Sequence, residues 1–437
     1  MIHASRAGHG SLVWGHGRLR LLLIALGALV ATVALAGAAR GATGGVTGAP
    51  PPGASKAHQP PAHKSQGNAL GSRGMWIWYI SQSSGGSLAS IVATAHAYGI
   101  STLMIKSGDG AGAWSQFNSQ VVAYLHAKGL RACAWQYVYG SQPIAEAEVG
   151  AAAVHAGADC LLIDAESEYE GKYVQAQQYV KKLRQLIGTG FPVGLAGFPY
   201  VDYHPAFPYS VFLGAGGAQY NVPQMYWPDI GTTVDYVYSH TYEFNTLYGR
   251  PIEPLGEVAG NPPPHQIVRF RQMSRAYGAP GVSWWDWQES SQRDWNAVGQ
   301  SVGNLSGFAA DPTMPVLSVK SAGGIWAGDL VLWAQEHLYK AQGPMTIDGS
   351  FGNQTQTAVE QFQAAHGLPV TGMVDPATWQ ALLRYQPVTV TWVTKRHKTV
   401  AVAGRAGGPI TLAVPASAHL PAVRYEIPRD LGAGRPR

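Results

Sequence analysis

Two acidic side chains separated by a single alanine are the residues best suited to catalysis. Asp164 and Glu166 close an apolar run that is predicted to be a β-strand. Alternate residues of a strand point to the same face, so both carboxyl groups are expected to share one space and to couple their titrations. One group then stays ionised while the other can protonate a leaving oxygen. The pattern predicts acid and base chemistry; a loop cap or a pairing with a basic side chain is the structural alternative.

Hydrolysis of a glycosidic bond is a reaction that such a pair can perform. When the substrate is a 2-acetamido sugar, its own acetamido oxygen can act as the nucleophile. Glu166 would then be the general acid and base, and Asp164 would orient and stabilise the acetamido group.

Strand-like runs alternate with amphipathic helical segments between residues 74 and 305. The strands are expected at Met75–Ile80, Thr102–Ser107, Arg131–Val138, Cys160–Glu166, Val193–Phe198, Val222–Trp227, Ile252–Val258 and Val282–Trp287. Eight strands in a segment of this length predict a (β/α)8 barrel. A doubly wound open sheet is the alternative, although no glycine-rich phosphate loop follows the first strand.

The residues at the carboxyl ends of these strands are mostly aromatic and acidic. Chemistry in a (β/α)8 barrel takes place at those ends. Aromatic faces stack on sugar rings and carboxylates supply acid and base, so the set favours a carbohydrate over a phosphorylated ligand. The expected substrate-binding residues are Trp78, Lys106, Gln136, Gln224, Tyr226, Trp227, Glu257, Trp284 and Asp286. Lys106 is expected either to pair with Asp164 or to form an ordinary ion pair of the barrel.

No metal and no cofactor are expected. The sequence has no H-x-H or H-E-x-x-H spacing, and its two cysteines lack zinc-like partners. A G-x-S-x-G nucleophile motif is also absent. Cys133 and Cys160 fall on adjacent predicted strands, so a disulfide is geometrically allowed, but buried free thiols are the expected state.

Two local motifs of the barrel resemble known glycosidases. Asp159–Glu166 resembles the fourth-strand D-x-x-D-x-D-x-E signature of TIM-barrel chitinases, with Leu162 in place of the middle aspartate, and is equally similar to the D-x-E of TIM-barrel muramidases. Gln224–Trp227 is similar to the chitinases' M-x-Y-D and keeps the tyrosine. The first strand, Met75–Ile80, lacks the aspartate of the muramidases. These departures leave room for a barrel that binds glycan without cleaving it.

A helical module with an internal near-repeat is predicted at residues 328–385. Ile347–Thr355 matches Val370–Thr378, since each has a glycine turn, an apolar anchor and a threonine that leads into a helix. Helices are expected at Leu330–Lys340, Thr355–His366 and Pro376–Leu383. The module closely resembles the three-helix peptidoglycan-binding domain of bacterial wall hydrolases. The resemblance implies peptidoglycan as the ligand and a targeting role.

The N-terminus has the pattern of an export signal. Basic residues precede an uncharged apolar run, Leu21–Ala39, that contains small-residue cleavage sites. Residues 1–40 are therefore predicted to be a signal peptide or an uncleaved membrane anchor. Residues 41–73, rich in Pro, Gly and Ala, are predicted to be a disordered linker.

Composition and charge exclude other classes. The chain has 437 residues, of which 46% are hydrophobic and only 13% charged, which excludes a disordered polyelectrolyte and a long coiled coil. Its net charge of +5 arises at residues 1–73 and 386–437, so a folded nucleic-acid-binding face is not expected. After a linker at 306–327 and the helical module, the basic tail 386–437 could form a β-hairpin.

These observations predict an exported, cell-envelope-associated and monomeric glycan hydrolase that acts on peptidoglycan. The alternative is a non-catalytic peptidoglycan-binding or adhesion protein with a degenerate barrel. A peptide-bond hydrolase is third, because zinc and nucleophile motifs are lacking.

Overall fold

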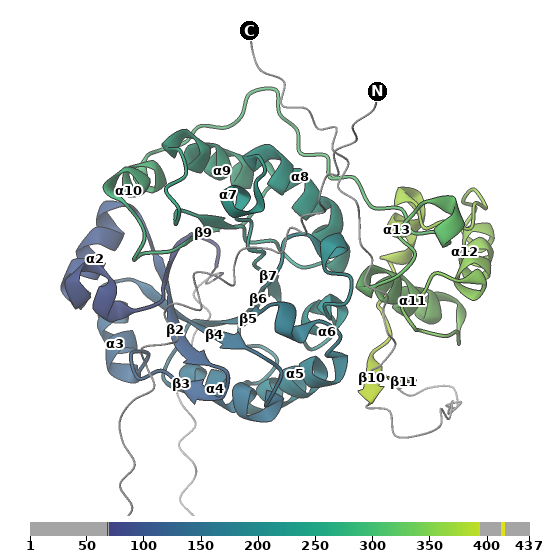
Figure 1. Ribbon diagram of the computed structural model, residues 1–437, viewed down its shortest axis with the longest axis horizontal. Helices are drawn as coiled ribbons and strands as arrows, with labels where there is room; N and C mark the ends of the chain where they lie inside the picture. The colour runs from purple at the N-terminus through teal and green to yellow at the C-terminus, as the bar shows by residue number, and fades with distance from the viewer. Residues whose placement is uncertain (1–67, 69, 394–411, 416–437) are drawn as a thin grey trace, which may run out of the picture. The chain divides into compact units, whose positions relative to one another are not determined.

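Eight parallel strands form a ring surrounded by helices (Figure 1). The computed structural model describes residues 68, 70–393 and 412–415. The strands are β1 (Arg73–Ile77), β2 (Thr102–Asp109), β4 (Arg131–Val138), β5 (Cys160–Ala165), β6 (Val193–Ala196), β7 (Tyr220–Asn221), β8 (Leu255–Glu257) and β9 (Val282–Trp285). They are ordered β7-β6-β5-β4-β2-β1-β9-β8, and the short β3 (Gly112–Ala113) pairs antiparallel with β2.

Backbone hydrogen bonds between the β7 and β8 segments close the ring. The amide of Asn221 donates to the carbonyl of Pro251, and the amide of Met225 donates to the carbonyl of Leu255. Parallel bridges join Asn221 to Ile252 and Gln224 to Leu255. The predicted (β/α)8 barrel is thereby confirmed.

The helices of the barrel lie in the order of the predicted pattern. They are α2 (Leu88–Ala97), α3 (Ser119–Ala127), α4 (Pro143–His155), α5 (Tyr173–Ile187), α6 (Tyr209–Leu213), α7 (Trp227–Ile230), α8 (Val234–Asn245), α9 (Pro264–Ala276) and α10 (Gln292–Gly299). Short 3-10 turns are η1 (Ile80–Gln82), η2 (Ser84–Gly86), η3 (Ser167–Tyr169), η4 (Val201–Tyr203), η5 (Thr246–Tyr248) and η6 (Lys320–Ala322). Side-chain caps from Ser87, Asn118 and Thr233 begin α2, α3 and α8.

The sixth strand of the barrel, β7, differs from its prediction at Val222–Trp227. The structure has a two-residue strand, β7, followed by isolated bridges, and Trp227 is already the first residue of α7. Pro223 has no N–H group and cannot donate to a strand ladder, and Pro228 suits the first turn of a helix. The two prolines therefore shorten the strand and start the helix early.

Alternate residues of the strands face either the interior of the ring or the helices. On β5, Cys160 and Leu162 belong to the interior cluster, whereas Leu161 and Ile163 pack with the residues of the surrounding helices. The interior is unusually rich in indole rings: Trp76 and Trp135 lie 5.6 Å apart between ring centroids, and Trp135 and Trp285 lie 5.5 Å apart.

Cys133 and Cys160 form a disulfide across neighbouring strands, so the expectation of free thiols was wrong. The two residues are direct partners in the β4–β5 register, with 4.6 Å between their Cα atoms. Both side chains point into the ring, where parallel pairing holds them together. Sequence spacing alone does not reveal this register.

Reduction of this disulfide is expected to lower the free energy of unfolding by about 3 kcal/mol, because the bond closes a loop in the unfolded chain. The two cysteines are 27 residues apart in sequence. Denaturant titrations with and without a reductant, and of the Cys133→Ala/Cys160→Ala variant, measure the effect. Equal stability of the oxidised and reduced protein would contradict it.

Three further helices, α11 (Asp329–Gln342), α12 (Asn353–Ala365) and α13 (Pro376–Leu382), form a C-terminal helical domain. The near-repeat has a physical basis in two glutamines. Gln335 accepts hydrogen bonds from the amides of Asp348 and Gly349, and Gln363 does the same for Thr371 and Gly372. Each glutamine also donates to the threonine hydroxyl that follows its turn. Both turns are thus stabilised by the same pattern of hydrogen bonds to a buried glutamine side chain.

Asp329, the first residue of α11, connects this helical domain to the barrel. Its buried carboxylate accepts hydrogen bonds from the Tyr173 hydroxyl, the Tyr248 hydroxyl, and both the amide and the hydroxyl of Ser210. The indole of Trp333 donates to the carbonyl of Leu247.

The strand β10 (Val390–Val393) pairs in parallel with β11 (Leu412–Pro415). The partner strand expected for a hairpin, residues 399–402, lies outside the described residues. The apolar run 21–39 and almost all of the linker 41–73 also lie outside them. Within the described chain, no helix combines the length and apolar character needed to cross a bilayer.

Candidate active site

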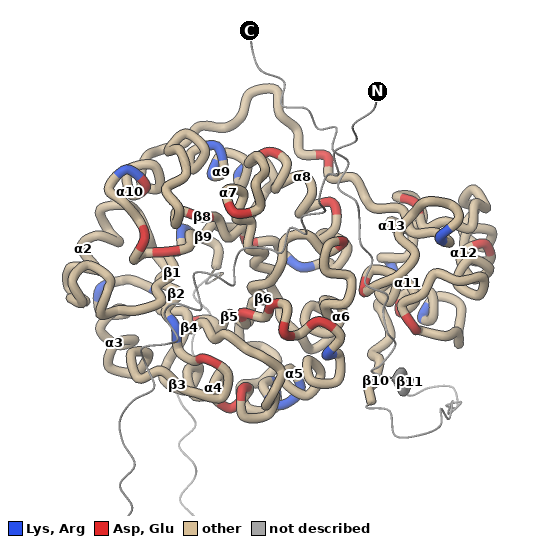
Figure 2. Tube along the Cα trace, in the orientation of Figure 1, with Lys and Arg blue, Asp and Glu red and all other residues tan. Residues whose placement is uncertain are grey.

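Asp164 and Glu166 lie together at the carboxyl end of β5, and a single amide connects them. The Gln224 side chain donates a hydrogen bond of 2.9 Å to Asp164 Oδ1 and one of 3.2 Å to Glu166 Oε1. Asp164 is buried and Glu166 is half-buried. Figure 2 shows acidic positions beside β5, and others beside β8 and β9. Three of the predicted site residues are therefore in contact.

Tyr137 belongs to the same group, although the prediction selected its neighbour Gln136. The Tyr137 hydroxyl donates to Glu168 Oε2 at 2.7 Å and lies 3.5 Å from Glu166 Oε2. Burial, followed by the negative charges of Glu166 and Asp164, raises the pKa of Tyr137 far above its ordinary value. The phenol therefore stays neutral and remains a hydrogen-bond donor.

Gln136 points out of the ring, which corrects its predicted role in binding substrate. Its side-chain amide donates to the carbonyls of Gly110 and Glu146 and accepts a hydrogen bond from the Tyr179 hydroxyl. On β4, Trp135 and Tyr137 face inward. The two-residue period of a strand, counted from Cys133, was the signal that could have selected Tyr137.

Trp227 and Trp284 are also outside the ring, so their predicted places at the mouth were wrong. Both rings pack on Phe270 of α9, with centroids 5.0 and 5.3 Å away, and both are fully buried. The indole of Trp227 donates to Gln266. The inward-facing residue at the end of β9 is Trp285, which was not among the predicted site residues. The prediction chose Trp284 and Asp286 instead, but β9 ends at Trp285, so its alternation does not extend to Asp286.

Trp78 and Tyr226 border the interior aromatic cluster as partly buried rings. The ring of Trp78 lies 5.7 Å from that of Trp285 and 6.3 Å from that of Trp135. These rings supply apolar faces of the kind that stack on sugars.

Lys106 is buried among these indoles. Its ammonium lies 4.5–4.9 Å from the ring centroids of Trp78, Trp114 and Trp135, and donates to Asp109 Oδ2 at 2.6 Å. This contact is an ion pair within the barrel, which is one of the two roles expected for Lys106. A positive charge is thus held among aromatic rings of the interior.

Two further acids, Glu257 and Asp286, are buried at the ends of β8 and β9. Burial raises the pKa of Glu257 to about 8, with a further contribution from the charge of Asp229. Burial raises the pKa of Asp286 to about 7. Asp286 accepts hydrogen bonds from Gln288 and from the amide of Glu289, whereas Glu257 Oε2 has no hydrogen-bond partner among the described residues. Near pH 7 these groups can donate as neutral carboxylic acids.

Glu257→Gln is expected to flatten the pH dependence of stability between pH 5 and 8. The folded protein holds a proton on Glu257 that the unfolded chain releases above about pH 4.5, so this acid makes the free energy of unfolding fall as pH rises, by up to about 1.4 kcal/mol per pH unit. The neutral glutamine lacks that dependence, so the stability of Glu257→Gln relative to the wild type should rise by roughly 3–4 kcal/mol between pH 5 and pH 8. Denaturant titrations across this range test it, with Glu148→Gln on the protein surface as the control. Parallel curves for wild type and Glu257→Gln would refute it.

The described residues contain no group of three or more His, Cys, Asp or Glu side chains arranged to hold a metal ion.

Comparison with known proteins bears on the helical domain first. Residues 327–382 match the model of a family described as "Putative peptidoglycan binding domain". The predicted peptidoglycan-binding domain is confirmed. A curated relative, an "Uncharacterized protein in bpoA1 3'region" of Kitasatospora aureofaciens, is 44% identical over 63 residues, which are 14% of this chain and 52% of that protein. The chain thus matches about half the length of that relative.

Solved structures similar to parts of the chain include a peptidoglycan-binding protein, a chitinase and a spore cortex-lytic enzyme. The peptidoglycan-binding protein of Clostridioides difficile is 36% identical, with a TM-score of 0.14, over 16% of this chain and 40% of that one. A chitinase from Chromobacterium violaceum is 12% identical, with a TM-score of 0.36, over 52% and 97%. The spore cortex-lytic enzyme SleL of Bacillus cereus is 9% identical, with a TM-score of 0.39, over 55% and 76%.

Proposed function

We propose that this protein is an exported cell-wall hydrolase that cleaves the glycan strands of peptidoglycan. The observation that carries the proposal is the Asp164–Gln224–Glu166 group in the aromatic interior of a barrel that is joined to a peptidoglycan-binding domain. The binding domain holds the enzyme on its polymer, which raises the effective concentration of glycan at the barrel without new contacts there.

In the proposed mechanism, Glu166 donates a proton to the glycosidic oxygen as the bond to the leaving sugar breaks. The carbonyl oxygen of the substrate's acetamido group attacks the anomeric carbon, and Asp164 orients and stabilises that group. The Glu166 carboxylate then takes a proton from the water that opens the cyclic intermediate. Gln224 keeps both carboxyl groups in position, and the neutral Tyr137 hydroxyl lies beside Glu166.

The Cys133–Cys160 disulfide supports the proposed export, because disulfides persist in oxidising compartments outside the cytosol. The signal or anchor at residues 1–40 and the monomeric state remain parts of this proposal. So do the glycan contacts assigned to Trp78, Tyr226, Glu257 and Asp286.

A wall-binding protein without hydrolytic activity is the second candidate. Leu162 stands where the resemblance to chitinases calls for an aspartate, and β1 contributes no acid to the interior.

Incubation of the full-length protein with purified peptidoglycan tests the proposal. New reducing ends in the soluble products are the expected result. New amino groups without reducing ends would identify a peptide-bond hydrolase instead. Retention on the wall with neither product would support the second candidate and overturn the first.

A further inference from the structure

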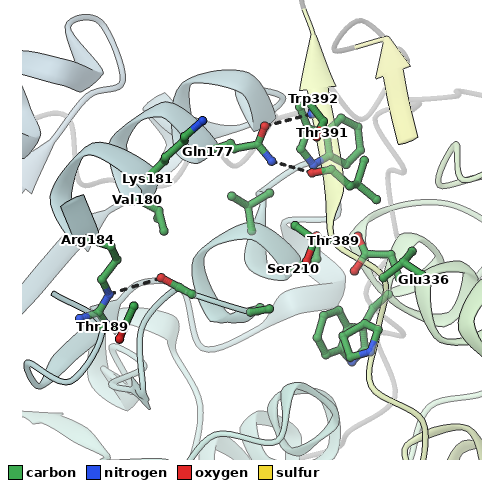
Figure 3. A pocket seen from close by; sticks show the side chains of 18 of the residues that line it. Gln177, Val180, Lys181, Arg184, Thr189, Ser210, Glu336, Thr389, Thr391 and Trp392 are labelled. Atoms are coloured by element: carbon green, nitrogen blue, oxygen red, sulfur yellow. Dashed lines mark hydrogen bonds between the residues drawn. The ribbon is translucent and has the colours of Figure 1, made fainter. Parts of the chain in front are cut away.

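A pocket of about 500 Å³ lies on the outer side of the barrel helices, apart from the carboxyl pair of the interior (Figure 3). Its walls come from α5 and α6 of the barrel, from α11 of the peptidoglycan-binding domain and from β10. The side chain of Gln177 fastens β10 in place, because it donates to the carbonyl of Val390 and accepts from the amide of Trp392. The pocket is therefore formed jointly by the barrel, the peptidoglycan-binding domain and β10.

The carboxyl group of Glu336, on α11, faces this pocket. The residue is 5% exposed, and no hydrogen bond or ion pair reaches its side chain from the described residues. Figure 3 shows its two oxygens directed into the pocket, toward Ser210 and Thr389. Asp329, two turns earlier on α11, has donors on both of its oxygens. Buried polar atoms are normally hydrogen-bonded, so the contrast indicates that the carboxyl oxygens of Glu336 accept hydrogen bonds from a ligand in the pocket.

Some wall residues can bind a positively charged group, although Lys181 and Arg184 also line the pocket. Trp333 and Trp392 are among the residues that line the pocket, and indole rings attract cations. The guanidinium group of Arg184 donates hydrogen bonds to the carbonyls of Gly188, Phe191, Gly216 and Gly217 and to the side chain of Gln219. Its donors are therefore not available to bind an anion.

Burial favours the neutral form of the Glu336 carboxyl group over the charged form. Burial, with a contribution from the charge of Asp329, raises the pKa of Glu336 well above its ordinary value. The charged groups that line the pocket are Lys181 and Arg184 of α5, and β10 and α6 contribute none. An entering ammonium ion would displace the carboxyl proton to solvent and leave a neutral, hydrogen-bonded pair.

We propose that this pocket binds a primary ammonium group of a cell-wall peptide, with Glu336 as its counter-ion. The choice of peptide rests on the proposed wall function, since the diamino acid of peptidoglycan stem peptides carries an ammonium group on its side chain. The enzyme would then bind the wall peptide at the junction of its two domains, while the barrel hydrolyses the glycan.

Calorimetric titration of the full-length protein with the stem tripeptide L-alanyl-γ-D-glutamyl-meso-diaminopimelate tests this site. Acetylation of the side-chain amine of the tripeptide is expected to weaken binding at least about tenfold, as is Glu336→Gln, because a charge-assisted hydrogen bond is lost. Glu360→Gln, in the same domain but outside the pocket, should bind as the wild type does. The acetylated peptide tests the wild-type protein itself, so the result does not depend on whether a variant folds.

Peptide binding that is unchanged by acetylation, or that survives Glu336→Gln, would overturn the ammonium site. Reducing-end release from glycan strands stripped of their peptides provides the separate measurement. Activity there without tripeptide binding would overturn this inference alone, and tripeptide binding without activity would overturn only the proposed hydrolase.

Discussion

Glu166→Gln is expected to reduce the release of reducing ends from peptidoglycan by about 10³-fold, the loss typical of a general acid. Glutamine keeps the size of the side chain and can still contact Gln224, but it cannot donate a proton to a leaving oxygen. Binding to the wall should be unchanged, because Glu166 lies in the barrel, outside residues 327–382 of the peptidoglycan-binding domain. Product analysis on the purified full-length variant, together with a wall-sedimentation assay, measures both quantities.

Glu170→Gln is the matched control for this variant. Glu170 is an exposed carboxylate four residues later in the chain, where it contacts His204 rather than the site. The Glu170→Gln variant should release reducing ends as fast as the wild type does. Asp164→Asn should lose activity on N-acetylated glycan, because it no longer stabilises the charge that develops on the acetamido group. Unchanged activity of Glu166→Gln would remove the catalytic assignment, whatever the control shows.

Asp329→Ala is expected to lower the free energy of unfolding by about 3–5 kcal/mol, the range for removing one partner of a buried charged interaction. The carboxylate accepts four hydrogen bonds from the barrel, and its loss leaves the buried hydroxyls of Tyr173 and Tyr248 and the amide of Ser210 without an acceptor. Burial raises the pKa of Asp329 to about 6, and the hydrogen bonds from Ser210 and Tyr248 oppose that rise.

Denaturant titration measures this loss, and hydrogen exchange locates it. Slowly exchanging amides of α11 and of the neighbouring barrel helices should become faster, because Asp329 joins the two domains. Asp311→Ala, at an exposed position of the segment between them, should change stability by less than about 0.5 kcal/mol. An Asp329→Ala protein with wild-type stability would show that the domains do not depend on this contact.

The sequence was sufficient for the barrel and the helical domain because both depend on local patterns. Strand runs and helices follow from the spacing of apolar residues, and polar caps such as Ser87 and Asn118 start helices by contacts a few residues away. The near-repeat of the helical domain was visible because each turn needs its own glycine and threonine. The Asp164–Glu166 pair was visible for the same reason, since the period of one strand places both residues on one face.

Contacts between distant segments were decided only by the tertiary structure. Gln224 reaches Asp164 across 60 residues, and Asp329 meets Tyr173 across 156. The neighbouring residues Trp284 and Trp285 face opposite ways: Trp284 packs against the helices outside the strands, and Trp285 faces the interior of the barrel. Which of the two faces inward depends on how β9 sits in the sheet. The Cys133–Cys160 bond required the register of two parallel strands. Local spacing carries no information about register or about which helices meet, because these depend on packing over the whole chain.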